Sequence, residues 1–256
     1  MQHRLNIALK ACREASEVIK TFYKKKKQDE LKQFKENYRI FFNLILRTIN
    51  DSYPMGEKDF IGPSAISKDL IDGVNDKSFG DFDNKGSYIW VINPIDNIDN
   101  YLNKIPLYNI TIAIFLNNEI ECSIIYDPIN DILINAIKGE GAKKENTRLR
   151  NKKEIDEKIL YATNDLSYIQ TINNKINGNV RILGSPSKEF VYLAEGKLDL
   201  LIYPNIEVWD YAAGALICRE SGLIVTDFNG GNDIFLKKNL IAGRHTLHDK
   251  LLKALK

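Results

Sequence analysis

The sequence is poor in the residues that bind zinc or form disulfides. Its 256 residues include only three cysteines and three histidines. Cys12, Cys122 and Cys218 lie far apart and form no CxxC pair, a pattern typical of reduced, buried thiols in a cytoplasmic protein. Two of the histidines, His245 and His248, lie close together near the end of the chain. We therefore expect neither a disulfide framework nor a zinc site.

Long apolar runs and a strong charge imbalance are also missing. No run of about eighteen apolar residues occurs, so we expect no membrane-spanning helix. The opening stretch "MQHRLNIALKACREA" lacks the apolar core and cleavage site of a signal peptide. The formal net charge is +2, which argues against the whole chain being an electrostatic nucleic-acid binder. Basic residues gather locally at 24–27 and 143–153, where solvated surface is the simpler interpretation.

The first half of the sequence predicts two helices followed by antiparallel strands. Apolar residues recur at helical spacing over residues 5–23 and 38–49. Short turns such as "LNNE" and "DPIND" then separate strand-like runs, which favours antiparallel neighbours. These runs cover residues 88–92, 109–115, 120–127 and 132–137.

In the second half, strand-like and helix-like segments alternate, which predicts crossover connections and a largely parallel sheet. The predicted helices and strands cover residues 158–164, 180–183, 187–197, 198–203, 209–221, 222–228, 239–243 and 246–255. We therefore expect two parts. Residues 1–150 would form helices over an antiparallel sheet, and residues 151–256 would form an α/β part.

Carboxylates stand at the ends of two apolar elements. Asp96 and Asp99 follow the strand 88–92 in a Pro-containing turn, and Asp210 opens the helix 209–221. A carboxylate in such a turn is usually a turn former, and one in the first turn of a helix interacts favourably with the helix dipole. Taken singly, neither position predicts a catalytic site.

Several segments from Trp90 onward match known motifs in the same order. They are "WVINPIDNIDNYLNKIPLYNITIAI", "IIYDPINDILINAIKGEGA", "RILGSPSKEFVYLAEGKLD", "VWDYAAGALICRESGLIVTDFNGG" and "NLIAGRHTLHDKLLKAL". Together they resemble the inositol monophosphatase family of magnesium-dependent phosphomonoesterases, including its bacterial extragenic-suppressor branch. The first segment resembles the family pattern W-(I/V)-(I/V)-D-P-(I/L)-D-G-T-x-N, and the fourth resembles W-D-x-A-A-G.

The resemblance implies an alternating α-β-α-β-α sandwich, a homodimer, and hydrolysis of a small phosphomonoester by metal-activated water. It assigns Asp96 and Asp210 as catalytic carboxylates and Mg²⁺ ligands. Asn93 and the backbone carbonyl of Ile95 occupy two further ligand positions. The substrate-binding positions that it implies are Asn97, Ile98, Gly184 and Ser185.

Several positions depart from the family pattern. Asn93 replaces an aspartate that bridges metals, Asn97 replaces a glycine, and Ile98 replaces a threonine that positions the attacking water. Tyr203 stands where a substrate-binding glutamate is expected, and the upstream segment near residues 37–38 lacks its aspartate. Replacing a carboxylate by an amide at 4 Å from a cation removes about 4 kcal/mol at an effective dielectric constant of 20. That loss corresponds to about three decades of affinity.

A further metal-binding glutamate is expected in "SYPMGEKDFIGPSAI", and two alignments are open. Aligning "FIG" with the family places Pro63 and Ser64 at the two glutamate positions, and we favour this alignment. Aligning "GE" instead makes Glu57 a metal ligand.

Two hypotheses follow from these residues. The first is a pseudoenzyme or severely impaired enzyme that keeps the fold as a scaffold for a protein partner. By resemblance to the extragenic-suppressor branch, that partner would belong to transcription antitermination. The second is an active magnesium phosphatase that hydrolyses inositol phosphate or another small phosphomonoester through Asp96 and Asp210. The changes at the metal-binding positions favour the first hypothesis.

Overall fold

The computed structural model describes residues 1–24, 30–52, 58–62, 88–151, 158–174, 176–232, 234 and 237–255. The two alternatives for the metal-binding glutamate, Glu57 and Pro63, lie outside these residues, as do the lysines at 25–27. All three cysteines are free and buried, as predicted. No helix in the described ranges is long and apolar enough to cross a membrane.

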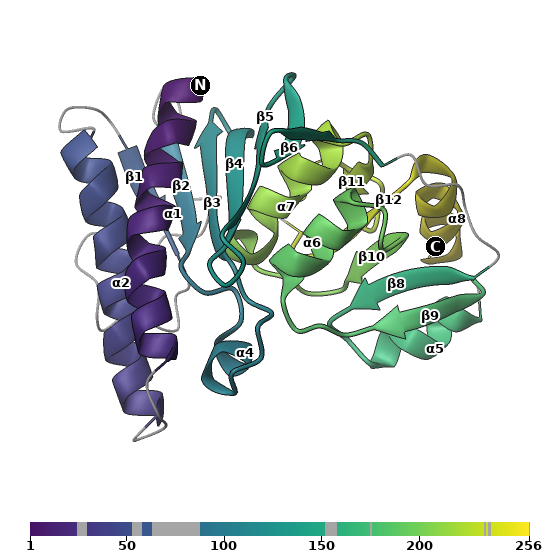
Figure 1. Ribbon diagram of the computed structural model, residues 1–256. Helices are drawn as coiled ribbons and strands as arrows, with labels where there is room; N and C mark the ends of the chain where they lie inside the picture. Colours follow the sequence, from purple (N-terminus) through teal and green to yellow (C-terminus); the bar gives the residue numbers. More distant parts are fainter. Residues whose placement is uncertain are drawn as a thin grey trace.

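Two long amphipathic helices form the first layer of the fold. Helix α1 (Gln2–Tyr23) buries the apolar stripe that predicts it. Helix α2 (Glu30–Ser52) begins well before the predicted start at residue 38. The reason is that the buried Phe34 continues the apolar spacing through a lysine-rich segment. The two helices pack side by side against one face of the first sheet (Figure 1).

The first sheet has seven strands in sequential order, and every pairing except β1 with β2 is antiparallel. Asn117 and Asn118 form the tight turn between β3 and β4 with positive φ angles of 51° and 64°. Such a turn matches the twist of the two strands it joins. The strands are β1 (Lys58–Ile61), β2 (Tyr88–Asn93), β3 (Ile110–Leu116), β4 (Glu119–Asp127), β5 (Ile132–Ile137), β6 (Gly141–Lys144) and β7 (Thr147–Leu149).

Both faces of the first sheet are buried, and β2 shows how. Trp90 and Ile92 point to the side of α1 and α2, whereas Ile89 and Val91 belong to the core on the opposite side. This follows from the two-residue period of a strand. Packing on both faces therefore holds β2 in place, and with it Asn93 at the end of the strand.

The second sheet has the order β11-β12-β10-β8-β9. The expected parallel arrangement is found in β9, β8 and β10, whereas β12 runs antiparallel to both β10 and β11. Helix α7 carries the chain from β10 to β11, whereas the described residues between β11 and β12 form no helix, and the chain reverses there. The elements are β8 (Ile159–Thr163), α5 (Ser167–Asn173), β9 (Gly178–Arg181), α6 (Pro186–Ala194), β10 (Leu200–Tyr203), α7 (Val208–Glu220), β11 (Ile224–Thr226), β12 (Leu240–Gly243) and α8 (His245–Leu255).

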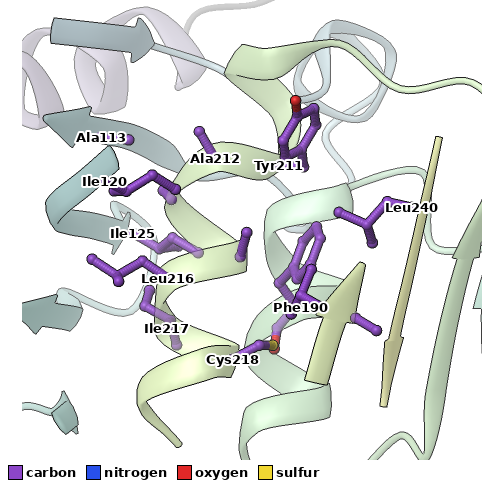
Figure 2. Close-up of a cluster of buried hydrophobic side chains, with 14 of the residues drawn as sticks. Ala113, Ile120, Ile125, Phe190, Tyr211, Ala212, Leu216, Ile217, Cys218 and Leu240 are labelled. Carbon is purple, nitrogen blue, oxygen red and sulfur yellow. The ribbon is translucent and has the colours of Figure 1, made fainter. Parts of the chain in front are cut away.

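Three hydrophobic clusters hold together the five layers of the fold, which agree with the predicted α-β-α-β-α sandwich. The first lies between α1, α2 and the first sheet. The second surrounds α6 and α7 and contains side chains from both sheets. The third joins the far face of the second sheet to α5 and α8. Figure 2 shows the middle layer, where Phe190 of α6 and Leu216 and Ile217 of α7 fill the core.

The glycine-rich turn between β5 and β6 is tied to the end of α7. The Glu220 carboxylate accepts hydrogen bonds from the N–H groups of Gly139 and Gly141, each at 2.8 Å. Both glycines have positive φ angles, of 78° and 92°, which non-glycine residues rarely adopt. The contact fixes the far end of α7, and the opposite end of this helix carries Asp210.

Close packing of α6 on α7 requires a glycine at position 214. A Cβ atom there would lie 2.2 Å from Cγ and 2.5 Å from Cβ of Phe190. We expect Gly214→Ala to lower the free energy of unfolding by about 1–3 kcal/mol through overpacking, measured by urea denaturation. Alanine is the better helix former by about 1 kcal/mol. An unchanged or higher stability would therefore show that the two helices do not approach this closely.

Candidate functional site

The candidate site lies where the end of β2 meets the N-terminal ends of α6 and α7. Asn93 is the last residue of β2, and a short turn leads from it into α4 (Ile98–Leu102). Asn97 caps α4, because its side chain accepts a hydrogen bond of 2.6 Å from the N–H of Asn100. Asp210 lies in the first turn of α7. Three rigid elements therefore hold the polar side chains of the site.

Asp96 is surrounded by donors from this chain. Its Oδ1 accepts the N–H of Asn109 at 2.7 Å. Its Oδ2 accepts hydrogen bonds from the hydroxyls of Ser185 at 2.5 Å and Ser187 at 2.6 Å, and from the N–H of Ser187 at 3.3 Å. Ser187 lies in the first turn of α6, where the helix dipole also favours a carboxylate. With four hydrogen bonds accepted, this carboxylate is satisfied without any further ligand.

Asn93 joins three layers of the molecule through its side-chain amide. The amide oxygen accepts the hydroxyl of Tyr38 at 3.1 Å and the N–H of Ile95 at 3.3 Å. The amide nitrogen donates to Oδ1 of Asp210 at 3.0 Å. A backbone N–H can only donate, so the amide oxygen must face Ile95 and the nitrogen must face Asp210.

Burial and like charge dominate the electrostatics of the site. Burial, followed by the charges of Asp96 and Glu207, raises the pKa of Asp210 to about 8, and the hydrogen bond from Asn93 offsets part of this shift. Burial also raises the pKa of Asp96, against the lowering effect of its hydrogen bonds. The pKa of Tyr38 lies well above its ordinary value because of burial and then the charges of Asp210 and Asp96. Its hydroxyl therefore stays protonated and acts as a donor.

A second set of hydrogen bonds connects α4 to the loop before α6. The side-chain amide of Asn97 donates to the backbone carbonyl of Gly184. The side-chain amide of Asn100 donates to the carbonyls of Leu107 at 2.7 Å and Leu183 at 3.0 Å. Gly184 has a φ angle of +74°, and a Cβ atom at this position would lie 3.1 Å from Nδ2 of Asn97. The Asn97 side chain thus bridges the space between α4 and residue 184.

The structure brings most of the sequence-predicted positions together. Asn93 contacts Asp210 directly, Asp96 contacts Ser185, and Asn97 contacts Gly184. The side chains of two further predicted positions lie in the core that also contains α1 and α2. Ile98 packs against this core with an apolar side chain, and the side chain of Ile95 is buried in it, whereas the predicted ligand atom of Ile95 is its backbone carbonyl oxygen.

Four residues of the site were not assigned a role from the sequence. Tyr38 belongs to the apolar stripe of α2, whose spacing predicts burial but no polar contact. Asn109 and Ser187 hydrogen-bond to each other at 2.6 Å as well as to Asp96. Glu189 accepts the N–H of Leu183 at 2.9 Å and the hydroxyl of Tyr203. The only sequence signal for these residues is their closeness along the chain to predicted site positions.

The described residues do not fit the pair of Mg²⁺ ions that the resemblance implies. Mg²⁺ requires several oxygen ligands at about 2.1 Å in near-octahedral geometry. The oxygens of Asp96 and the amide oxygen of Asn93 already accept hydrogen bonds, and Asn93 presents an N–H group to Asp210. Within the described ranges, no three His, Cys, Asp or Glu side chains are grouped to hold a metal ion.

Comparison with known proteins places the chain in a family. The sequence profile of the inositol monophosphatase family matches residues 1–256. Nus factor SuhB of Pasteurella multocida is 31% identical over 279 residues, which cover 100% of this chain and 96% of that protein. The crystal structure of the extragenic suppressor protein suhB from Bartonella henselae has a TM-score of 0.80 at 28% identity, covering 98% of each chain. An inositol-1-monophosphatase of Mesorhizobium japonicum is 32% identical over 179 residues, 65% of this chain and 67% of that protein.

This chain belongs to the inositol monophosphatase family. The match extends over the whole sequence, so it includes α1, α2 and the other elements before Trp90, where sequence motifs gave no resemblance. The layered fold agrees with that assignment.

The raised pKa of Asp210 predicts a pH-dependent stability. In the unfolded chain this carboxyl ionises near its ordinary pKa of 3.8, whereas in the folded protein it keeps its proton up to about pH 8. The folded state therefore binds more protons across this window, and the free energy of unfolding falls as pH rises. Between pH 5 and pH 8, we expect the free energy of unfolding to fall by about 2–4 kcal/mol less in Asp210→Asn than in the unmodified protein. The measurement is urea denaturation with a chelator present.

The exposed Asp99→Asn variant, which changes the formal charge equally, is the control. It should follow the pH dependence of the unmodified protein. If Asp210→Asn does the same, Asp210 is ionised in the folded state at neutral pH and the electrostatic account of the site is wrong.

Proposed function

We propose that this chain is a catalytically impaired member of the inositol monophosphatase family that acts as a protein-binding scaffold. The observation that carries the proposal is the 3.0 Å hydrogen bond from the Asn93 amide to Asp210. In the family pattern an aspartate at this position bridges metals. Here an N–H group lies against Asp210 where a cation and an anionic oxygen would be needed.

The remaining ligand positions support the same conclusion. Asp96 keeps its carboxylate, but its two oxygens accept four hydrogen bonds from Asn109, Ser185 and Ser187. A cation would have to displace several of these bonds, and bonds to a charged acceptor contribute about 1.5–3 kcal/mol each. The loss of charge at Asn93 adds an unfavourable change of about 4 kcal/mol to cation binding. Together these terms oppose Mg²⁺ binding at ordinary millimolar concentrations.

The substrate side of the site has also changed. The resemblance places the phosphomonoester between the start of α4 and residues 184–185. In this chain the Asn97 side chain occupies that position and donates to the Gly184 carbonyl. Ile98 provides no hydroxyl to orient a water molecule, because its side chain is apolar and packs against the core. Among the described residues, the site therefore offers neither a hydroxyl at position 98 to orient a water molecule nor a suitable set of metal ligands.

For the scaffold role we propose a partner from transcription antitermination, acting in the cytoplasm on a homodimer of this chain. The support is the name Nus factor SuhB carried by relatives that match the whole chain. The β6–β7 hairpin and the residue after it offer a positively charged surface for such a partner, since Lys143, Arg148 and Arg150 are exposed. Lys143 and Arg148 stand directly opposite each other, which costs stability, and an acidic partner would relieve this repulsion.

The proposal predicts that the unmodified protein neither binds Mg²⁺ nor hydrolyses phosphomonoesters. Titration calorimetry with MgCl₂ to about 10 mM, well above cellular levels, should give no saturable heat. Phosphate release from inositol monophosphate and a panel of small phosphomonoesters should equal that of an Asp96→Ala, Asp210→Ala control. Metal-dependent turnover above this control would support the alternative, an active phosphatase that uses both aspartates.

Binding to the transcription machinery should depend on the basic hairpin. We expect the protein to co-sediment with purified bacterial RNA polymerase and antitermination factors. Lys143→Glu with Arg148→Glu should weaken this binding at least about tenfold, by reversing the charge that faces an acidic partner. Lys10→Glu with Arg47→Glu makes the same charge change on α1 and α2 and serves as the control. Equal effects of the two double variants would exclude the hairpin as the binding surface.

A further inference from the structure

Tyr38 brings a side chain of the outer helical layer into the site. It lies on α2 and is 1% exposed, with its ring 5.8 Å from that of Phe34, one turn earlier on the same helix. Its hydroxyl reaches the side-chain oxygen of Asn93 at 3.1 Å, across 55 residues of sequence. Such a buried, packed ring cannot leave the site without moving α2.

We propose that Tyr38 is a specificity-determining residue that weakens the binding of divalent cations at the site independently of the change at Asn93. This inference rests on the proposed function. Its consequence is that restoring the family aspartate at position 93 does not by itself restore the full affinity for a cation.

The side-chain oxygen of residue 93 has two lone pairs that can accept hydrogen bonds. One lone pair accepts a hydrogen bond from the Tyr38 hydroxyl, and the other accepts one from the N–H of Ile95. Asn93→Asp keeps an oxygen at this place, so both donors remain and the bond from Tyr38 becomes a stronger one to a charged acceptor. A cation that binds this oxygen must first displace the phenol. The second carboxylate oxygen would take the place of the amide nitrogen and face Asp210, so the phenol occupies one of the two ligand atoms of residue 93.

Removing only the phenol oxygen isolates this effect. Tyr38→Phe keeps the ring against Phe34 and leaves the oxygen of residue 93 accessible to a cation. In the Asn93→Asp background the new carboxylate joins Asp96 and Asp210, which gives three carboxylates to hold the ion. A hydrogen bond to a charged group opposes cation binding by about ten- to a hundredfold.

The test is titration calorimetry with MnCl₂ on four proteins: unmodified, Asn93→Asp, Asn93→Asp with Tyr38→Phe, and Asn93→Asp with Tyr161→Phe. Tyr161 is the matched control, because its buried hydroxyl bonds to Asn173 in a different core cluster. We expect the Tyr38→Phe double variant to bind Mn²⁺ at least about tenfold more tightly than Asn93→Asp. The Tyr161→Phe double variant should match Asn93→Asp.

Equal affinities of Asn93→Asp and its Tyr38→Phe double variant, or no binding by the latter, would overturn the role of Tyr38. Tight Mn²⁺ binding by the unmodified protein would instead overturn the proposed function. If Asn93→Asp does not fold without metal, the same comparison is made from the thermal midpoint at rising MnCl₂. The midpoint of the Tyr38→Phe double variant should then begin to rise at an at least about tenfold lower concentration.

Discussion

The hydrogen bonds of the Asn93 amide are the constraint on which the rest of the site depends. The strand that carries Asn93 is packed on both faces, so the amide cannot move away from its neighbours. It accepts from Tyr38 of the outer helices and donates to Asp210 of the central helix. A neutral amide can serve both partners at once. A carboxylate at the same place could not donate to Asp210, and the two groups would need a proton or a cation between them.

The neighbouring polar groups follow from the same constraint. In a buried site an unsatisfied polar group is costly, so a polar cluster is stable only when its members satisfy one another. Asp96 meets this requirement through Asn109, Ser185 and Ser187, and the loop at Gly184 is bonded to Asn97. The family fold is kept, and its polar centre in the described ranges is a hydrogen-bonded cluster in which the buried side-chain oxygen of Asn109 lacks a partner. A surface role such as partner binding needs only the fold to persist.

Local patterns in the sequence predicted the elements well, and long-range contacts poorly. Apolar spacing predicted α1 and the strands that flank Asn93, because a buried face of a helix or strand has apolar residues at regular intervals along the sequence. It missed the start of α2, where lysines interrupt the apolar spacing before Tyr38. The contact of Tyr38 with Asn93 could not be predicted, since nothing in a buried helical tyrosine indicates which strand its hydroxyl will reach. Motif resemblance identified Asn93, Asp96, Asp210 and Ser185, but not the donors Tyr38, Asn109 and Ser187.

The most direct test of the central claim is the anomalous scattering of manganese in a crystal grown with a high concentration of MnCl₂. The account predicts no anomalous peak beside Asn93, Asp96 and Asp210, with the Asn93 amide nitrogen still within hydrogen-bonding distance of Asp210. A manganese peak at about 2.2 Å from oxygens of Asp96 and Asp210, with Asn93 turned to offer its oxygen, would contradict it.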